Sequence, residues 1–426
     1  MKITAVGGYN AVGRNMTGVS VGKETVAIDD GIRLDTLQMY DKEVEMLEDK
    51  SLEDLIRMDI IPDASLLHNV KAQLISHGHL DHVGALPFNK PKAPIASTPY
   101  TMEIAKREYK GGDFHSLDYG EEFHIHPGLS AEFLEVTHSI PQSSIVVLHT
   151  HEGDVVYASD FRFDNSSQIA RTDYKRLREL GSGNVKALIV ESTRSKVEEK
   201  TPPESIVKAK LLDVMEFIDS GLIVATTFST HVERIQTILD VAEKSGRTPL
   251  ILGRSMIKNI ELARRFGLLE LPSSAKLLAT AKAITAGLQE IRRREDYFVL
   301  ATGHQGEPDS VLSRIIDGTL PFKMRKDDSV LFCADVIPSP INRASRYVLE
   351  SKLKGFGANI FTGLHVSGHA SREDHRYLLK MLKPEHIIPC HGDIGMRANY
   401  AALAAEEGYE LNRQVHLLMN EGSIDI

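Results

Sequence analysis

Apolar and polar residues alternate over the first 35 positions of the chain, in short stretches separated by glycine-containing turns. The stretches Lys2 to Val6, Met16 to Val21 and Thr25 to Asp29 are rich in strand-forming residues, and together they predict a strand meander. Residues 36–67 are acidic and carry Leu, Met and Ile at helical spacing, which predicts a helical excursion before the next strand.

Short apolar runs recur from Lys71 onward and predict core strands: AQLIS, APIAS, FHIH, SIVVLHT, DVVYAS and KALIVES. Between about Pro202 and Gly355, helical and strand-like stretches alternate, which predicts a mostly parallel sheet with helices on both faces. After Gly355 the strand-like ANIFTG and HIIPC return, separated by the helical stretch Arg372 to Leu382. We therefore expect an α/β domain over 196–355, inserted into a first domain made of 1–195 and 356–426.

Composition supports an ordinary globular protein. The chain has 426 residues, 42% of them hydrophobic and 26% charged, and is long enough for two or three units. It lacks both an apolar run long enough to span a bilayer and a secretory leader, so we expect no membrane contact and a cytoplasmic location. Cys333 and Cys390 lie far apart, which fits core thiols in a reducing compartment.

The net charge of −9 argues against a uniformly basic surface for nucleic acid. A negative net charge is still compatible with a local basic groove. Arg254 to Arg265 and Arg292 to Arg294 are the clusters that would supply one, although a run of charge is also typical of a solvated helix face.

The densest chemical signal follows the apolar run AQLIS, where the chain reads His77-Gly78-His79-Leu80-Asp81-His82. Two histidines at i and i+2 of an extended stretch project to the same side, and Asp81 and His82 follow as the chain turns. Four potential ligands in six residues can reach two adjacent ions. Imidazole and carboxylate together suit Zn²⁺, with Mn²⁺ as the alternative, and the absence of nearby cysteine argues against a structural zinc finger.

Three further residues stand directly after strand-like runs: His138 after AEFLEVT, Asp160 after VVYAS and His391 after HIIPC. Each alone is as typical of a helix cap or a satisfied polar group as of a ligand. Their common position at strand ends predicts that they share one edge of a sheet with the His77 to His82 segment.

The order HxHxDH, His, Asp, His resembles the metallo-β-lactamase superfamily of binuclear hydrolases. The resemblance implies a four-layer αββα sandwich with the metals between the ends of two sheets. It also implies that His77, His79 and His138 hold one metal, that Asp81, His82 and His391 hold the other, and that Asp160 bridges them. Asp29 matches the aspartate that orients the metal-binding loop from behind the ligands, with Asp30 as the alternative.

The inserted segment narrows the resemblance to the β-CASP nucleases. Glu191 precedes the insert, His369 closes it and His391 follows, as in the acidic, His and His motifs of that group. Within the group, TGHQGEPDSVLSRI and HVSGHASREDHRYLLKMLKPEHIIPCHGD resemble ribonuclease J, and the similarity spans essentially the whole chain. Bacterial members carry a further C-terminal domain, so the chain resembles the short archaeal form.

The resemblance also assigns roles to single residues. Asp81, Glu191 and His369 would be catalytic, with Glu191 orienting a histidine and His369 donating a hydrogen bond or a proton to the phosphodiester. Ser367 and His369 would contact the same phosphate. Arg254 and Ser255, after the strand-like PLIL, would lie near a 5′-phosphate pocket, because N–H groups at a helix start and an arginine fork hold phosphate.

The implied activity is 5′-to-3′ exonuclease cleavage of single-stranded RNA with a 5′-monophosphate, by a protein expected to be a homodimer. Internal cutting also occurs in the family, and nothing in the spacing decides between the two. Three alternatives remain at this stage. One is an endonuclease resembling the cleavage and polyadenylation factor, which lacks TGHQGEP; another is a small-molecule hydrolase such as a thioesterase, which lacks the insert. The third is a non-catalytic RNA-binding subunit, in which the metal motifs would have decayed.

Overall fold

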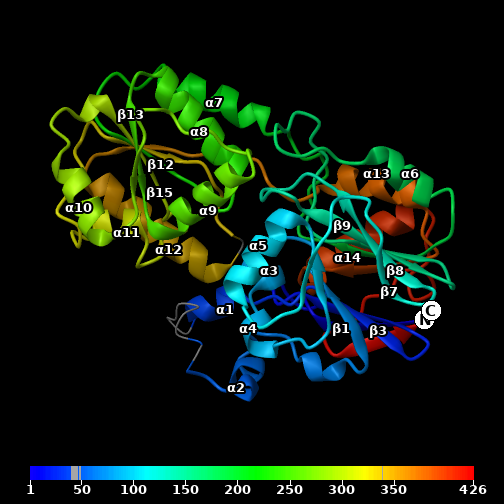
Figure 1. The fold of residues 1–426 in the computed structure, drawn as a ribbon. Coiled ribbons are helices and arrows are strands. Elements are labelled where there is room, and N and C mark those ends of the chain that lie inside the picture. The colour runs from blue at the N-terminus through cyan, green and yellow to red at the C-terminus, as the bar shows by residue number, and fades with distance from the viewer. Residues whose placement is uncertain (40–46, 48, 338) are drawn as a thin grey trace. The chain divides into compact units, whose positions relative to one another are not determined.

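The computed structural model describes residues 1–39, 47, 49–337 and 339–426, which form two compact units (Figure 1). Unit 1 comprises Met1–Asn165, Ala170–Thr201 and Gly368–Ile426, and unit 2 comprises Ser166–Ile169 and Pro202–Ser367. Among the described residues, no helix combines the length and the apolar character needed to cross a membrane.

One sheet of unit 1 has seven strands in the order β19-β1-β2-β3-β4-β5-β6. Its first part is the expected antiparallel meander, and β3 to β6 run parallel to one another. The strands are β1 (Lys2–Gly7), β2 (Met16–Val21), β3 (Glu24–Ile28), β4 (Val70–Leu74), β5 (Ile95–Ser97), β6 (Phe114–Ser116) and β19 (Gly422–Asp425).

The other sheet of unit 1 has six strands in the order β18-β11-β10-β9-β8-β7. Strands β7 to β10 are antiparallel, whereas β10, β11 and β18 are parallel. The strands are β7 (Phe123–His126), β8 (Leu129–Glu135), β9 (Ser144–Thr150), β10 (Asp154–Ala158), β11 (Val185–Glu191) and β18 (His386–Cys390).

The two sheets of unit 1 pack face to face over one apolar core. Side chains of both sheets alternate inward and meet there, among them Val26, Phe133 and Ile189, all fully buried. A second core lies between the six-stranded sheet and the helices α6 (Tyr174–Leu180), α13 (Arg372–Leu382) and α14 (Ile394–Glu406). Unit 1 is thus the αββα sandwich that the resemblance implies.

The remaining helices of unit 1 belong to the N-terminal half of the chain: α1 (Leu34–Met39), α2 (Leu52–Arg57), η2 (Ala64–Leu66), α3 (Leu80–Val83), α4 (Leu86–Asn89) and α5 (Pro99–Glu108). Part of the helical excursion expected over residues 36–67 falls at 40–46 and 48, outside the described residues. In the described part it is broken into short pieces, and the Ser51 side chain caps α2 by accepting a hydrogen bond from the amide of Asp54.

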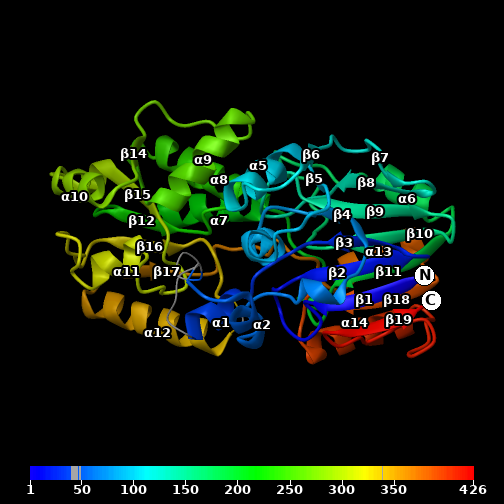
Figure 2. The ribbon, with the colours of Figure 1, turned by 60° about the horizontal axis from the view of Figure 1, so that its bottom comes forward.

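Unit 2 contains a six-stranded sheet in the order β14-β13-β15-β12-β16-β17, in which every pair is parallel. Figure 2 shows helices α7, α8 and α9 on one side of this sheet and α11 and α12 on the other. The strands are β12 (Ile223–Thr226), β13 (Thr248–Leu252), β14 (Lys276–Leu278), β15 (Tyr297–Ala301), β16 (Ser329–Phe332) and β17 (Asn359–Phe361). The helices are α7 (Ser205–Met215), α8 (Val232–Lys244), α9 (Arg254–Arg265), α10 (Ala281–Gln289), η3 (Arg294–Asp296), α11 (Val311–Ile316) and α12 (Pro340–Gly355).

Helix α8 illustrates why the alternating pattern produces two covered faces. Its buried residues Val232, Ile235, Ile238, Leu239 and Ala242 recur at helical spacing and give the helix one apolar stripe. Strands buried on both sides in turn read as continuous apolar runs, as in β12 and β16. The expected mostly parallel sheet with helices on both faces is confirmed.

The second unit ends later than the expected insert, at Ser367 against 355. The reason is β17, which pairs with β16 and so extends the parallel sheet of unit 2. The sequence ANIFTG, which contains β17, does not indicate which sheet this strand joins.

Candidate metal centre

Most potential ligands in unit 1 follow the carboxyl ends of its parallel strands, whereas His138 follows β8, which is paired antiparallel. In the six-stranded sheet, Ala158 of β10 pairs with Val190 of β11, and Val190 pairs with Pro389 of β18. Asp160 and His391 each come two residues after these paired positions, so the register alone places them at one edge. His77 and His79 follow β4 of the other sheet in the same way, while Asp81 and His82 lie on the short helix α3.

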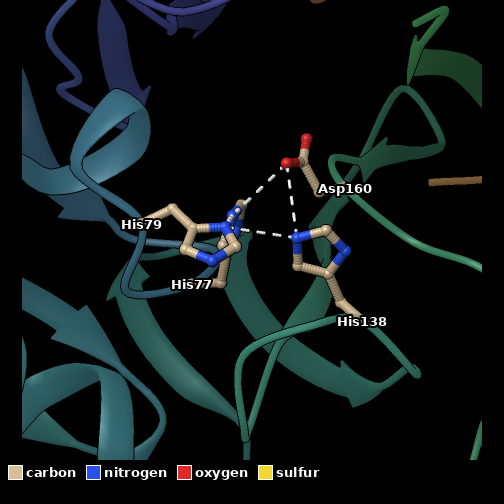
Figure 3. A group of neighbouring side chains, drawn as sticks. All are labelled: His77, His79, His138 and Asp160. Carbon is tan, nitrogen blue, oxygen red and sulfur yellow. Dashed lines mark hydrogen bonds and ion pairs between the residues drawn. The ribbon is translucent and has the colours of Figure 1, made fainter. Parts of the chain in front are cut away.

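One group consists of three histidines and an aspartate: His77, His79, His138 and Asp160 (Figure 3). The Nδ1 atom of His79 lies 3.2 Å from Nε2 of His77 and 3.2 Å from Nε2 of His138. Asp160 Oδ2 lies 3.5 Å from each of those two Nε2 atoms. The four side chains converge on one point.

The other group consists of Asp81, His82, Asp160 and His391. Its Asp160 atom is Oδ1, which lies 3.5 Å from Nε2 of His82 and 3.4 Å from Nε2 of His391. Asp81 Oδ2 lies 3.7 Å and 3.8 Å from the same two nitrogens. Asp160 therefore gives one carboxylate oxygen to each group, and it is the only residue common to the two groups.

The spacing of these atoms fits Zn²⁺. Ligands 2.0–2.1 Å from a tetrahedral ion lie about 3.3 Å from one another. The first group has separations of 3.2–3.5 Å and the second has separations of 3.4–3.8 Å. Asp160 Oδ1 and His391 Nε2 are buried without a hydrogen-bond partner among the described residues, which a bound cation would explain.

Hydrogen bonds from behind the ligands fix the imidazole rings. Nδ1 of His138 lies 2.7 Å from the carbonyl oxygen of Gly368, and Nδ1 of His82 lies 2.7 Å from Asp29 Oδ2. A carbonyl or carboxylate oxygen can only accept, so each ring donates from Nδ1 and keeps the lone pair of Nε2 for the group. His79 differs, because its Nδ1 faces the other histidines.

Asp29 is fully buried and holds several parts of the site at once. Its Oδ1 accepts from the amide of Ser76 at 2.8 Å, and its Oδ2 accepts from the hydroxyls of Ser76 and Tyr157 at 2.9 Å each, besides His82. Asp30 points elsewhere and accepts from the amide side chain of Asn89 at 2.7 Å. Of the two aspartates, Asp29 bonds the imidazole of His82 through its side chain, whereas Asp30 meets His82 through its backbone amide.

The protonation of His79, His138 and Asp160 suits a cation. Burial lowers the pKa of His79 to about 3 and also lowers the pKa of His138, so both rings are neutral at pH 7. Burial opposes ionisation of Asp160, but the neighbouring histidines outweigh it and hold the pKa of Asp160 well below its usual range. His82 differs: burial opposes its charged form, but Asp160, Asp81 and Asp29 raise its pKa well above the usual value, so this ring must release its Nε2 proton when a cation binds.

Glu191 and His369 form a pair beside the two groups. Nδ1 of His369 lies 3.0 Å from Glu191 Oε2, and Nε2 of His369 lies 3.8 Å from Asp160 Oδ2. Glu191 Oε1 accepts from the amides of Phe161 and Ala370 at 3.3 Å each, which fixes this carboxylate. The side chain of His369 is 26% exposed, whereas that of Glu191 is fully buried.

The charge of this pair follows from its burial and its partners. Burial opposes protonation of His369, but the Glu191 and Asp160 carboxylates outweigh it and raise the pKa of His369 to about 9. Burial opposes ionisation of Glu191, but His369 outweighs it and lowers the pKa of Glu191. The pair is therefore a carboxylate beside an imidazolium that can donate a hydrogen bond.

The remaining predicted residues belong to unit 2. Arg254 and Ser255 are exposed and open the first turn of α9, after Gly253 in a conformation with φ of 111°. Within TGHQGEP, His304 is buried and packs edge-on against Phe228, with 4.1 Å between the ring centroids. Ser367 ends unit 2 directly before Gly368, whose carbonyl accepts from His138.

Several residues around the metal groups had no sequence prediction. Asn15 contacts Asp81, His82 and His391, and Ser159 Oγ lies 3.2 Å from His82 Nδ1. Ser76 Oγ lies 3.1 Å from His77 Nδ1. Ser76 and Ser159 each directly precede a predicted ligand, and that position could have identified them from the sequence. Only its place in a glycine-rich loop distinguishes Asn15 in the sequence.

Family models match two parts of the chain. Residues 220–349 match the model described as "Ribonuclease J, beta-CASP domain", which covers most of unit 2. Residues 357–415 match the model described as "Zn-dependent metallo-hydrolase RNA specificity domain", and this range contains His369 and His391.

Curated relatives match over essentially the full length. Ribonuclease J of Methanocaldococcus jannaschii is 46% identical, covering 99% of this chain and 97% of that protein. Ribonuclease J of Pyrococcus abyssi is 44% identical, covering 100% and 97%. Ribonuclease J 1 of Streptococcus pyogenes is 27% identical, and the match covers 99% of this chain but 73% of that protein.

A solved structure, that of a protein of unknown function from Enterococcus faecalis, has a TM-score of 0.68 to this fold at 17% identity and covers 99% of both chains. At that identity it supports the fold alone. Together with the His and Asp groups of unit 1, the full-length matches at 44–46% identity establish that the chain belongs to the ribonuclease J family of metal-dependent ribonucleases.

Proposed function

We propose that this ribonuclease binds two zinc ions and degrades single-stranded RNA from a 5′-monophosphorylated end in the 5′-to-3′ direction. The observation that carries the two-metal part is the placement of Asp160, whose two carboxylate oxygens each belong to a different ligand group. A carboxylate in that position would hold one ion with each of its oxygens. The family model's zinc dependence supports the choice of metal.

The ligands assigned to the first zinc are His77, His79 and His138, and those assigned to the second are Asp81, His82 and His391, with Asp160 between the two ions. When bound, the pair of ions would supply Lewis-acid chemistry, polarising the phosphodiester and making water a stronger nucleophile at neutral pH. The chain fixes where that chemistry occurs, because hydrogen bonds from behind the ligands hold their rings.

His369 is the group assigned to the substrate. Its side chain is 26% exposed and carries a proton on each ring nitrogen when charged, so its Nε2–H can donate to a phosphodiester oxygen. The same proton can pass to the leaving 3′-oxygen. Glu191 is a positioning residue here: it accepts from Nδ1–H, and its other oxygen is held by two backbone amides.

Recognition of the 5′ end is assigned to Arg254 and Ser255, whereas Ser367 is assigned, with His369, to the phosphodiester that is cut. A helix start provides backbone N–H groups and a positive dipole end, and an arginine can hold a phosphate with two parallel hydrogen bonds. RNA as the substrate has the support of the relatives named ribonuclease J. We also propose that the protein forms a homodimer.

The test compares three forms of one RNA: with a 5′-monophosphate, with a 5′-triphosphate, and circular. The proposal expects mononucleotides from the monophosphorylated RNA, slower decay of the triphosphorylated RNA and intact circles. Asp81→Ala is the control for contaminating nuclease. Circles cut as fast as the monophosphorylated RNA would contradict the exonuclease direction and favour internal cutting.

A further inference from the structure

Asn15 lies in the loop between β1 and β2 and is 2% exposed. Its backbone amide donates to the carbonyl oxygen of Asp81 at 3.1 Å, and its side-chain Nδ2 donates to the same oxygen at 2.9 Å. Its side-chain Oδ1 lies 2.8 Å from Nδ1 of His391, 376 positions along the chain. The same Nδ2 lies 3.1 Å from Nε2 of His82. One amide side chain thus contacts three residues assigned to the second zinc.

The contacts fix which way the Asn15 amide points. The carbonyl of Asp81 can only accept, so the NH₂ group must face it, and the amide oxygen must face His391. His391 must then donate from Nδ1. Its Nε2 keeps a lone pair, and this atom is buried 3.8 Å from Asp81 Oδ2 and 3.4 Å from Asp160 Oδ1 without a hydrogen-bond partner in the described parts of the chain.

The backbone around this contact is arranged to permit it. His391 has a φ of 47°, a conformation that L residues adopt only where surrounding contacts hold it. Gly8 has a φ of 85°, and a Cβ at that position would come within 2.2 Å of Asn15 Oδ1. Glycine at position 8 therefore leaves the space that the Asn15 side chain occupies.

We infer that Asn15 is a positioning residue for the second metal: it sets the tautomer and the orientation of His391 and ties that histidine to the Asp81 backbone. This inference rests on the proposed two-zinc function. Ligand histidines depend on the group that accepts their second ring proton, and removal of such a group typically weakens metal binding about 10- to 100-fold.

The test uses three variants of the full-length, zinc-loaded protein. Asn15→Ala removes the acceptor for His391 and the donor to Asp81, whereas Asn15→Asp keeps an acceptor and removes the donor. Asn10→Ala is the matched control, because Asn10 lies in the same loop, is exposed, and accepts from the backbone amide of Asn420. Zinc affinities come from competition with a chelator, and the site that loses metal is identified from anomalous zinc scattering in crystals.

A second measurement separates positioning from general loosening of the fold. In the wild type, the Nδ1 proton of His391 is buried against Asn15 and should exchange slowly with solvent in NMR spectra. We expect Asn15→Ala to lose this protection and to bind the second zinc about 10- to 100-fold more weakly, with the first zinc retained. Asn15→Asp should keep the protected proton and lose less affinity, and Asn10→Ala should match the wild type.

Asn15→Ala that binds both zinc ions as the wild type does would overturn the inference. Equal losses in Asn15→Ala and Asn15→Asp would overturn the role of the acceptor. If the proposed two-zinc function is wrong, the wild type itself will bind fewer than two zinc ions. If the wild type binds no zinc at the second group, the inference about Asn15 is wrong as well.

Discussion

Both units present polar side chains where parallel strands end, but the two edges are built in opposite ways. At the edge in unit 1, the predicted ligands are mostly buried, bonded to one another and fixed from behind by residues such as Asp29. At the edge in unit 2, Arg254 and Ser255 stand exposed at the start of a helix. A buried, fixed group suits chemistry, and an exposed helix start suits recognition of a mobile chain end.

The difference has a physical cause. Buried polar atoms are costly unless every one is satisfied, and a bound cation would satisfy atoms such as Asp160 Oδ1, which is buried without a hydrogen-bond partner in the described parts of the chain. Exposed polar residues bear no such cost, because water hydrates them until a ligand binds. Changes at the first edge should therefore abolish turnover, whereas changes at the second should alter which RNA ends are used.

The largest effect is expected for Asp81→Ala. It removes a ligand of the second group that also lies 3.8 Å from His391. Loss of one metal forfeits several kcal/mol of transition-state stabilisation, so kcat should fall by about 10³-fold or more. Single-turnover cleavage of monophosphorylated RNA measures the rate, and elemental analysis should show less zinc per chain. An Asp81→Ala variant with the zinc content and the cleavage rate of the wild type would show that Asp81 is not a metal ligand.

His369→Ala is expected to come next. Without the donor at Nε2, kcat should fall by about 10³-fold while both zinc ions remain. Elemental analysis of the same preparation is the control. Loss of zinc together with activity would make His369 a ligand, since His369, Glu191 and Asp160 also bring potential ligand atoms close to one another.

Glu191→Gln should have a smaller effect, about 10- to 100-fold in kcat, because it acts through the orientation of His369. The substitution also removes the charge that keeps His369 protonated, so the pKa of His369 should fall from its raised value of about 9. NMR titration of His369 checks this. Unchanged turnover with an unchanged titration would show that Glu191 has only a structural role.

Arg254→Ala tests the edge in unit 2. It should leave kcat and zinc content unchanged and raise KM for monophosphorylated RNA by about tenfold, the value of one charged hydrogen bond. Lys258→Ala, one turn further along the exposed side of α9, is a matched control for loss of positive charge. Equal effects of the two variants would indicate general attraction of RNA in place of a phosphate contact.

The smallest effect is expected for the stability of unit 1, from the charge of a histidine outside the metal centre. His149 lies between Asp154 and Glu132, at 2.8 Å and 3.0 Å, and hydrogen bonds to these carboxylates raise the pKa of His149 to about 9. A raised pKa stabilises the folded state fully below the unfolded value of about 6.5, and this stability is lost as the pH rises through 9.

His149→Gln should therefore lower the free energy of unfolding by about 1 kcal/mol at pH 6, after allowance for partial solvent screening, and by nothing near pH 10. Denaturant unfolding of both proteins across this range provides the measurement, and kcat at pH 7 should not change. A difference that grows with pH would have the wrong sign for this interaction.

Much of the centre could be predicted from the sequence because its residues follow recognisable strands. His138, Asp160 and His391 each follow an apolar run. The parallel strands β10, β11 and β18 bring Asp160 and His391 together, and β8, which precedes His138, runs in the same direction as β10 because both are antiparallel to β9. Asn15 could not be predicted, since an asparagine in a glycine-rich loop is equally typical of a turn, and its partner lies at the other end of the chain. The late end of unit 2 was missed for a related reason: a three-residue strand such as β17 does not encode its neighbour.

The central claim is that Asp160 bridges two metals, and anomalous scattering from crystals of the zinc-loaded protein tests it most directly. Two peaks are predicted, one surrounded by His77, His79 and His138 and the other by Asp81, His82 and His391, each within bonding distance of a different oxygen of Asp160. A single peak, or two peaks of which neither touches Asp160, would contradict the account.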